Sequence, residues 1–165
     1  MRKTASLTEN EARYLKLIYR AWEDSRQLGT TDIARILGVQ PPSVTEVLQI
    51  LHSKGLLRYK RYKKIEITKL GIKVAGKLLR RHRILEVYFA DILKCSPEEA
   101  CEEASRVDFH FSDRAIDALS RIYSTRTCPC GKHIPVRSQV LREREHTSSV
   151  PNRVVFSSEH QRRYP

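Results

Sequence analysis

The sequence predicts a mainly α-helical protein, with an N-terminal winged helix-turn-helix and a small β-hairpin wing ahead of an all-α region. Three features predict this fold. Two short helical patterns flank a glycine turn within residues 30–54, a basic hairpin pattern follows over residues 57–67, and amphipathic helical patterns continue to residue 122. These later apolar faces exceed what one small winged helix needs. They therefore predict a helical region through which two copies associate as a homodimer.

Charge is the strongest signal in the composition. The 165 residues include 31 Lys and Arg against 19 Asp and Glu, which gives a net charge of +12. A surplus of this size favours nucleic acid or an anionic surface as the partner. No stretch approaches the roughly 20 apolar residues of a membrane span, and the N-terminus lacks the apolar core of a signal peptide. We therefore expect a cytoplasmic protein with no membrane partner.

The helix pair at residues 30–54 has the pattern of a DNA-reading unit. The apolar face expected for the first helix comprises Ile33, Ala34, Ile36 and Leu37. Gly38 follows this helix at a position that favours the left-handed conformation. Pro41 suits the first turn of the second helix, where a proline costs no intrahelical hydrogen bond. Apolar residues then recur at the spacing of one helical face, which leaves a small polar front that can enter the DNA major groove. The residues expected to read bases are Gln40, Pro42, Ser43, Thr45 and Glu46.

The hairpin pattern directly after this pair predicts a basic wing. Side chains alternate on both sides of a tip that is rich in Lys and Arg. Such a run is often only a solvated turn, but its place beside a helix-turn-helix favours contact with phosphates. The residues expected to make these contacts are Lys60, Arg61, Lys63 and Lys64.

Capping residues predict where the other helices begin. A Thr-x-x-Glu capping box, Thr8 with Glu11, opens the first helix. Thr68, Ser96 and Ser112 precede three further amphipathic patterns, which end near residues 93, 107 and 122. The domains expected from these elements are a winged helix over residues 1–70, a helical domain over residues 71–137 and a flexible basic tail over residues 138–165.

A possible metal site begins on the longest predicted helix. His82 and Glu86 lie at positions i and i+4, so an imidazole and a carboxylate share one face. Further candidates on or beyond the next helix are Glu98, Cys101, Glu102, Asp108 and His110. Ligands of this kind suit Mn(II), Fe(II), Co(II) or Zn(II). The alternative for the His–Glu pair is an ordinary surface salt bridge.

The sequence Cys128-Pro129-Cys130 with His133 is a further candidate for metal. Its spacing is too tight for an ordinary zinc finger, and a second pair of ligands, such as Cys95 with Cys101, would have to complete it. Free or redox-sensitive thiols are the favoured alternative. An enzyme with a small organic substrate is not expected, because the chain has no Gly-rich loop, nucleophile motif or cofactor fingerprint.

In their order along the chain, these motifs resemble one known family. The matching segments are EARYLKLIY, TDIARILGVQPPSVTEVLQILHSKGLL, YKRYKKIEITKLG, RRHRILEVYFADIL, FSD at 111–113 and CPCGKHIP at 128–135. Over about residues 7–136 the chain resembles the diphtheria toxin repressor and manganese transport regulator family. The resemblance implies a winged helix followed by an all-α dimerisation and metal-binding domain. It also implies binding of Mn(II) or Fe(II), with Zn(II) possible, and repression of metal-uptake genes from palindromic operators.

The resemblance assigns the family's ancillary metal site to matching residues. His82 and Glu86 fall on its His and Glu, and Cys101 stands where a His is common. A thiolate at that position shifts preference towards softer metals such as Zn(II).

The primary site of the family matches poorly. The residues that depart from its ligands are Arg13, Lys16, Ser105, Asp108 and Phe109. His110 is one position late for the expected His. Two outcomes follow from these departures: the protein keeps one metal site, or Arg13 takes the place of an ion by pairing with Asp108. The alternative function is a winged-helix regulator that has lost primary-site gating and responds to thiol oxidation or to no small effector.

Overall fold

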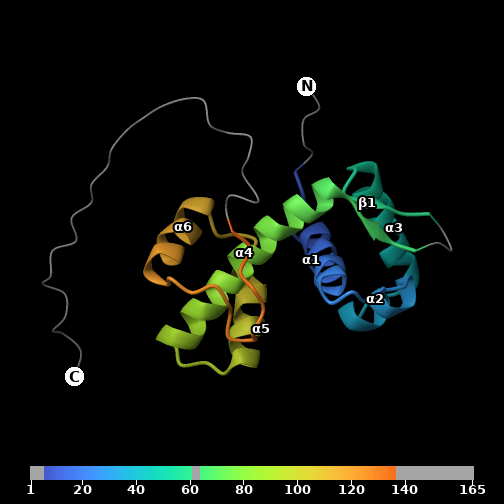
Figure 1. Cartoon of the computed structure of the whole chain (residues 1–165). Coiled ribbons are helices and arrows are strands. Elements are labelled where there is room, and N and C mark those ends of the chain that lie inside the picture. The colour runs from blue at the N-terminus through green and yellow to red at the C-terminus, as the bar shows by residue number, and fades with distance from the viewer. Residues whose placement is uncertain (1–5, 61–63, 137–165) are drawn as a thin grey trace, which may run out of the picture.

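The computed structural model describes residues 6–60 and 64–136. The first three helices and a small hairpin lie at one end of a long helix, and two further helices lie at its other end (Figure 1). Arg61, Lys63 and the predicted tail at 138–165 lie outside the described residues. The elements are α1 (Glu9–Glu23), α2 (Thr30–Leu37), α3 (Pro41–Ser53), β1 (Leu57–Arg58), β2 (Glu66–Ile67), α4 (Lys69–Ile92), α5 (Pro97–Val107) and α6 (Asp113–Ile122).

The three helices of the winged helix begin or end at the capping and turn residues that the sequence predicted. Thr8 caps α1, and its reciprocal bonds with Glu11 measure 3.2 and 3.1 Å. Gly38 ends α2 in the left-handed conformation with φ +67°. Pro41 begins α3, whose apolar face is buried. Ile36 is a correction: we expected it on the buried face of α2, but its side chain is 52% exposed.

The wing is a short antiparallel hairpin in which Leu57 pairs with Ile67. Each strand has only two residues, fewer than the alternating pattern suggested. The start of α4 packs tightly against this hairpin at Gly71, where a Cβ atom would lie 2.1 Å from the Leu56 carbonyl oxygen. Only glycine permits this close approach, so the wing and α4 are joined closely.

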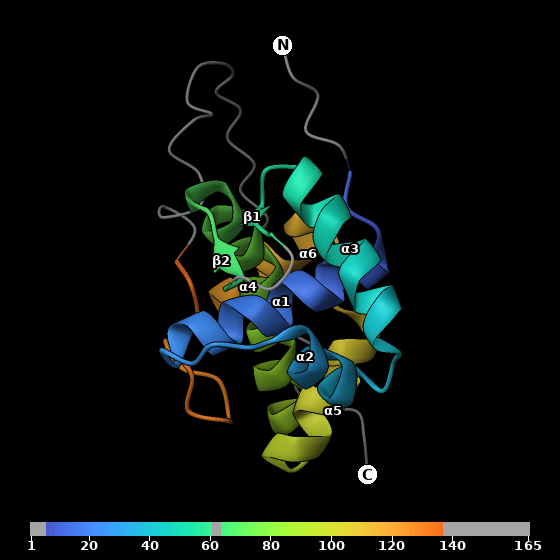
Figure 2. The same ribbon diagram turned by 90° about the vertical axis from the view of Figure 1, so that its right-hand side faces the viewer.

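Helix α4 belongs to both halves of the molecule. Thr68 caps it by accepting a hydrogen bond from the Gly71 amide at 3.0 Å. Its first half contributes Leu79 to the core of the winged helix, and its second half contributes Leu85 to a separate core with Ile116. Seen from the winged-helix side, α1, α2 and α3 lie in front of α4, with α5 below them (Figure 2). A change at the second core can therefore reach the winged helix through one continuous helix.

The helical half begins where the sequence predicted. Ser96 and Ser112 cap α5 and α6, and each side chain accepts a bond from a first-turn amide. Both helices pack on α4. In the part of the chain that the structure describes, no helix is both long and apolar enough to span a bilayer. The mainly helical fold with a two-stranded wing is confirmed.

Candidate metal centre

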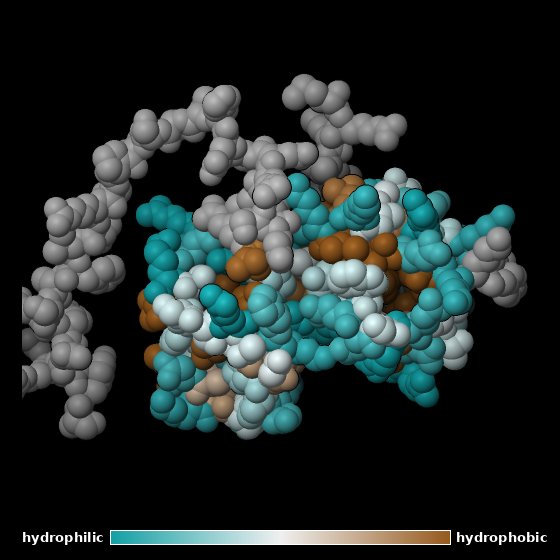
Figure 3. Space-filling model, viewed as in Figure 1, coloured by the Kyte–Doolittle hydropathy of each residue, from teal (hydrophilic) through white to brown (hydrophobic). Residues whose placement is uncertain are grey.

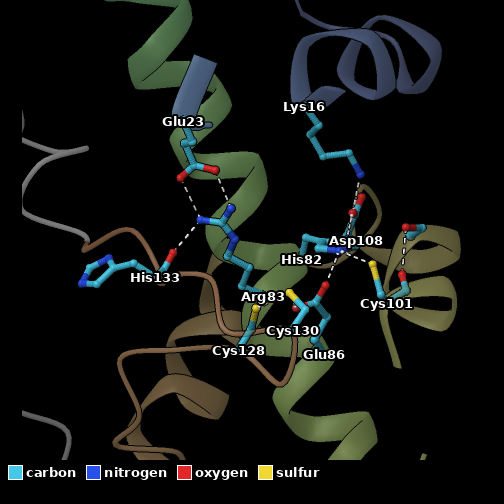
Figure 4. A network of polar contacts seen from close by, with 11 residues as sticks. Lys16, Glu23, His82, Arg83, Glu86, Cys101, Asp108, Cys128, Cys130 and His133 are labelled. Carbon is cyan, nitrogen blue, oxygen red and sulfur yellow. Dashed lines mark hydrogen bonds and ion pairs between the residues drawn. The ribbon is translucent and has the colours of Figure 1, made fainter. Parts of the chain in front are cut away.

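Three predicted ligands meet between α4 and α5. His82 and Glu86 come from successive turns of α4, and Cys101 faces them from α5 (Figure 4). His82 Nε2 lies 2.7 Å from Glu86 Oε1 and 3.5 Å from Cys101 Sγ. The side chains of His82 and Glu86 are each only 1% exposed. The pair is therefore not the surface salt bridge that the sequence left open as its alternative.

Glu86 Oε1 forms an ion pair with the His82 ring. His82 Nε2 lies 2.7 Å from this buried oxygen, which has no further hydrogen-bond partner among the described residues. In the metal-free protein the charge of the His82 ring therefore balances that of the carboxylate. A metal ion held by both side chains would take the place of the His82 proton.

The donor set fits a transition metal in spacing and chemistry. A tetrahedral ion with bonds of about 2.0–2.3 Å holds its ligand atoms roughly 3.3–3.8 Å apart. The His82–Cys101 separation of 3.5 Å already meets this, whereas the His82–Glu86 separation of 2.7 Å is closer. Glu86 would therefore have to turn slightly to admit an ion. One imidazole, one carboxylate and one thiol are ligands that Zn(II) and its neighbours accept.

The electrostatics of the pair favour opposite charges in the absence of an ion. Burial alone would lower the pKa of His82, but contacts with Asp108, Cys101 and Glu86 outweigh it and raise this pKa to about 9. Burial alone would raise the pKa of Glu86, but His82 and Cys128 outweigh it and lower this pKa to about 2. An incoming cation must therefore replace a proton on His82.

Two thiols lie against the other side of the same carboxylate. Cys130 Sγ is 3.5 Å from Glu86 Oε2, and the sulfur atoms of Cys128 and Cys130 are 2.8 Å apart. With Glu86 they form a second group of potential ligands. Burial, the neighbouring thiol and Glu86 raise the pKa of Cys128 to about 12. The suggested partners of these thiols were wrong: Glu86 faces them, whereas the His133 ring points away (Figure 4).

Asp108 lies behind the His82 ring rather than beside the other ligand atoms. Its Oδ2 is 2.9 Å from His82 Nδ1, on the opposite side of the ring from Glu86. The same oxygen accepts a hydrogen bond from the Lys16 ammonium of α1. A carboxylate in this position fixes the orientation of an imidazole whose other nitrogen faces a metal. The sequence had suggested Asp108 as a direct ligand.

Two other expectations differ from the structure. His110 does not join the ligand group, and its exposed ring lies 3.4 Å from Glu9. Of the two outcomes left open by the sequence, the pairing of Arg13 with Asp108 is not formed: Arg13 donates to the Leu37 carbonyl at 3.3 Å. Arg13 lies on the face of α1 that is turned towards α2, whereas Lys16, one turn further on, faces the helical domain.

A buried arginine fixes the segment that carries the thiols. Arg83 is 2% exposed and binds both carboxylate oxygens of Glu23, at 3.0 and 2.5 Å. It also donates to the His133 carbonyl at 2.5 Å. It thus joins α1, α4 and the Cys128–His133 segment. The sequence marked Arg83 only as part of a basic run, and no local pattern indicated a partner 60 residues away.

The predicted DNA-reading residues lie on one helix. Gln40, Pro42, Ser43 and Glu46 are exposed at or near the start of α3. Thr45 is half-buried, and its hydroxyl donates to the Pro41 carbonyl at 3.3 Å. On the wing, Lys60 and Lys64 are exposed.

A winged helix fused to a helical domain with a buried ligand cluster defines a class: metal-responsive DNA-binding proteins. Residues 6–65 match the family model of the iron dependent repressor N-terminal DNA binding domain. Residues 68–136 match that of the iron dependent repressor metal binding and dimerisation domain. The chain therefore belongs to the iron-dependent repressor family, the family of the diphtheria toxin repressor and the manganese transport regulator. These are metal-dependent transcriptional regulators, and the family binds divalent metals.

Individual relatives agree with this assignment. An uncharacterised HTH-type transcriptional regulator of Methanocaldococcus jannaschii is 32% identical over 107 residues, which cover 64% of this chain and 86% of the relative. The HTH-type transcriptional regulator MntR of Geobacillus kaustophilus is 32% identical over 106 residues, which cover 64% of this chain and 74% of that relative.

A solved structure, that of the manganese regulator SloR, superposes with a TM-score of 0.71 at 31% identity. The match covers 84% of this chain and 65% of SloR. The matched families and relatives give no support to the alternative of a regulator without metal gating.

Proposed function

We propose that this chain is a metal-gated repressor of metal-uptake genes that acts in the cytoplasm as a homodimer on a palindromic operator. The observation that carries the proposal is the buried group of His82, Glu86 and Cys101, which lies where α4 and α5 meet. The same α4 continues into the core of the winged helix. Relatives that are named as transcriptional regulators support a regulatory rather than an enzymatic role.

The proposed cofactor is a divalent transition metal: Mn(II), Fe(II) or Zn(II). His82, Glu86 and Cys101 would hold it. Cys128 and Cys130 form a second group of potential ligands with Glu86, next to its other oxygen. A bound ion would supply the positive charge beside Glu86 Oε1 that the protonated His82 ring supplies in its absence. The nearby thiols shift the preference from Mn(II) towards Zn(II), because thiolate is the softer ligand.

The proposed functions of DNA binding and metal binding belong to different segments of the chain. Residues 1–70 would bind DNA, residues 71–137 would bind the metal and the second copy, and residues 138–165 would form a basic tail. The exposed polar residues Gln40, Pro42, Ser43, Thr45 and Glu46 would face base edges. The lysines and arginine of the wing, Lys60, Arg61, Lys63 and Lys64, would contact phosphates.

Exposed apolar side chains at the far end of the helical half support a homodimer. Ile92 and Leu93 are 54% and 56% exposed at the end of α4, and Ile122 is 70% exposed at the end of α6. An interaction between Tyr123 and Asp91 shows that these two helix ends adjoin. Figure 3 shows small brown areas at this left-hand edge, and a larger brown area towards the winged-helix half. Covering Ile92, Leu93 and Ile122 with a second copy would bury this apolar surface.

Cobalt(II) tests the proposed metal centre directly, because thiolate ligation gives it intense near-ultraviolet absorption. The wild type is titrated beside His82→Ala and Cys101→Ser, with His133→Ala and Cys95→Ser as matched controls outside the three-ligand group. We expect the controls to resemble the wild type, Cys101→Ser to lose part of the thiolate band, and His82→Ala to bind at least about tenfold more weakly. Equal spectra and affinities for all five proteins would overturn the assignment.

A further inference from the structure

A chain of polar contacts runs from the winged helix to the candidate metal centre. It begins at the Lys16 ammonium on α1, which donates to Asp108 Oδ2. It continues from the same oxygen to His82 Nδ1 at 2.9 Å. It ends where His82 Nε2 faces Glu86 and Cys101 (Figure 4). Three helices therefore meet through side chains that each contact the next.

These contacts are shielded from solvent. The side chain of Lys16 is 13% exposed, that of Asp108 is 3% exposed and that of His82 is 1% exposed. A buried ion pair is seldom the most stable way to fill such a space, since apolar residues of similar volume often pack as well or better. Its cost points to a role in fixing geometry rather than in adding stability.

A single oxygen atom makes both central contacts. Asp108 Oδ2 accepts from Lys16 and from the His82 ring, so a movement of the ring displaces the atom that holds α1. A second buried link between α1 and α4, that of Glu23 with Arg83, differs in this respect. The described bonds of Arg83 reach Glu23 and the His133 backbone, and include none to the three ligands.

We propose that Lys16 is a positioning residue that transmits occupancy of the metal centre to α1 through Asp108. Asp108 then acts as the acceptor that orients His82, and the Lys16 ammonium supplies a positive charge beside it. The proposal rests on the metal-gated function proposed above and names the contact through which gating reaches the DNA-binding half.

Four variants separate this role from a general structural one. Lys16→Met removes the ammonium and keeps the apolar stem, while Lys16→Arg keeps a charge that can still reach Asp108. Arg13→Met is the matched control, because it removes the same charge from the same helix without touching Asp108. Asp108→Asn removes the acceptor behind His82. Thermal unfolding of each variant establishes that it is folded.

The first measurement compares metal affinity with operator affinity. Competition with a chelating dye gives the metal affinity. The DNA affinity is measured with Zn(II) and again with chelator, on a duplex selected from a random library. For Lys16→Met we expect metal affinity within about threefold of wild type, while the metal-dependent gain in DNA affinity falls by about tenfold. Lys16→Arg and Arg13→Met should keep that gain. Asp108→Asn should lose about 10–100-fold in metal affinity as well.

Hydrogen exchange in α1 gives a readout that does not depend on DNA. Zn(II) should slow exchange across Glu9–Glu23 in the wild type and in Arg13→Met, but not in Lys16→Met. A Lys16→Met protein that responds like the wild type overturns the link, as does a wild type whose α1 does not respond to Zn(II). If Zn(II) alters α1 exchange but leaves wild-type DNA affinity unchanged, the gating function fails while the link stands.

Discussion

At the scale of single residues, the protonation of His82 governs how a metal enters. Contacts with Asp108, Cys101 and Glu86 overcome the effect of burial and raise the pKa of His82 to about 9, so at neutral pH the metal-free ring carries its extra proton. Its raised folded-state pKa stabilises the metal-free protein below about pH 6.5, the ordinary pKa of His. That contribution is lost as pH rises through about 9.

The first prediction is therefore a pH dependence of metal binding. Between about pH 7 and pH 9, Zn(II) affinity should rise at least about tenfold per pH unit, because each ion displaces a proton from His82 and the thiols add further protons. Isothermal calorimetry in buffers of different ionisation enthalpy measures the protons released. An affinity that does not change with pH, with no proton release, would show that His82 does not bind the metal.

The residue scale also shows how far sequence reasoning reaches into the site. The grouping of His82 with Glu86 follows from helical spacing alone, and the family resemblance supplied Cys101. The contacts of Asp108 with Lys16 and of Cys130 with Glu86 join residues 92 and 44 positions apart. Such contacts depend on how α1 and the Cys128–His133 segment pack on α4, which no local pattern records.

At the scale of elements, caps and turns were predictable because they depend on a few neighbouring residues. Thr8, Thr68, Ser96 and Ser112 begin their helices as expected. The wing was predicted less well: its paired strands have two residues each, since pairing depends on contacts with the rest of the fold. The exposure of Ile36 likewise depends on which helices cover α2.

The second prediction concerns the junction of α4 with the wing. Gly71→Ala would place a methyl group 2.1 Å from the Leu56 carbonyl oxygen, so backbone must shift. We expect the free energy of unfolding to fall by about 3 kcal/mol or more. Urea denaturation measures this change. Gly29→Ala is the control, because its methyl group would meet only Asp32 Oδ2 at an ordinary 3.5 Å; similar losses in both variants would contradict the close-packed junction.

At the scale of the whole molecule, the long α4 joins the ligand cluster to the winged helix, and its far end adjoins α6 at the exposed apolar edge. The third prediction is that this edge holds the dimer together. Ile122→Glu should give monomers in sedimentation velocity and weaken binding to a palindromic duplex, because a buried unpaired charge is costly at an interface. Ile36→Glu, on the exposed face of α2, should remain dimeric; a dimeric Ile122→Glu protein would place the interface elsewhere.

Whether a metal held by His82 controls DNA binding can be measured in one titration. Fluorescence anisotropy gives the affinity for a duplex selected with metal-loaded protein, at fixed ionic strength, with Mn(II), with Zn(II) and with chelator. We expect metal to tighten binding at least about tenfold for the wild type and for His133→Ala. We expect no metal effect for His82→Ala. Wild-type binding that is equal with metal and with chelator, or an undiminished metal response in His82→Ala, would show that a metal at His82 does not control DNA binding.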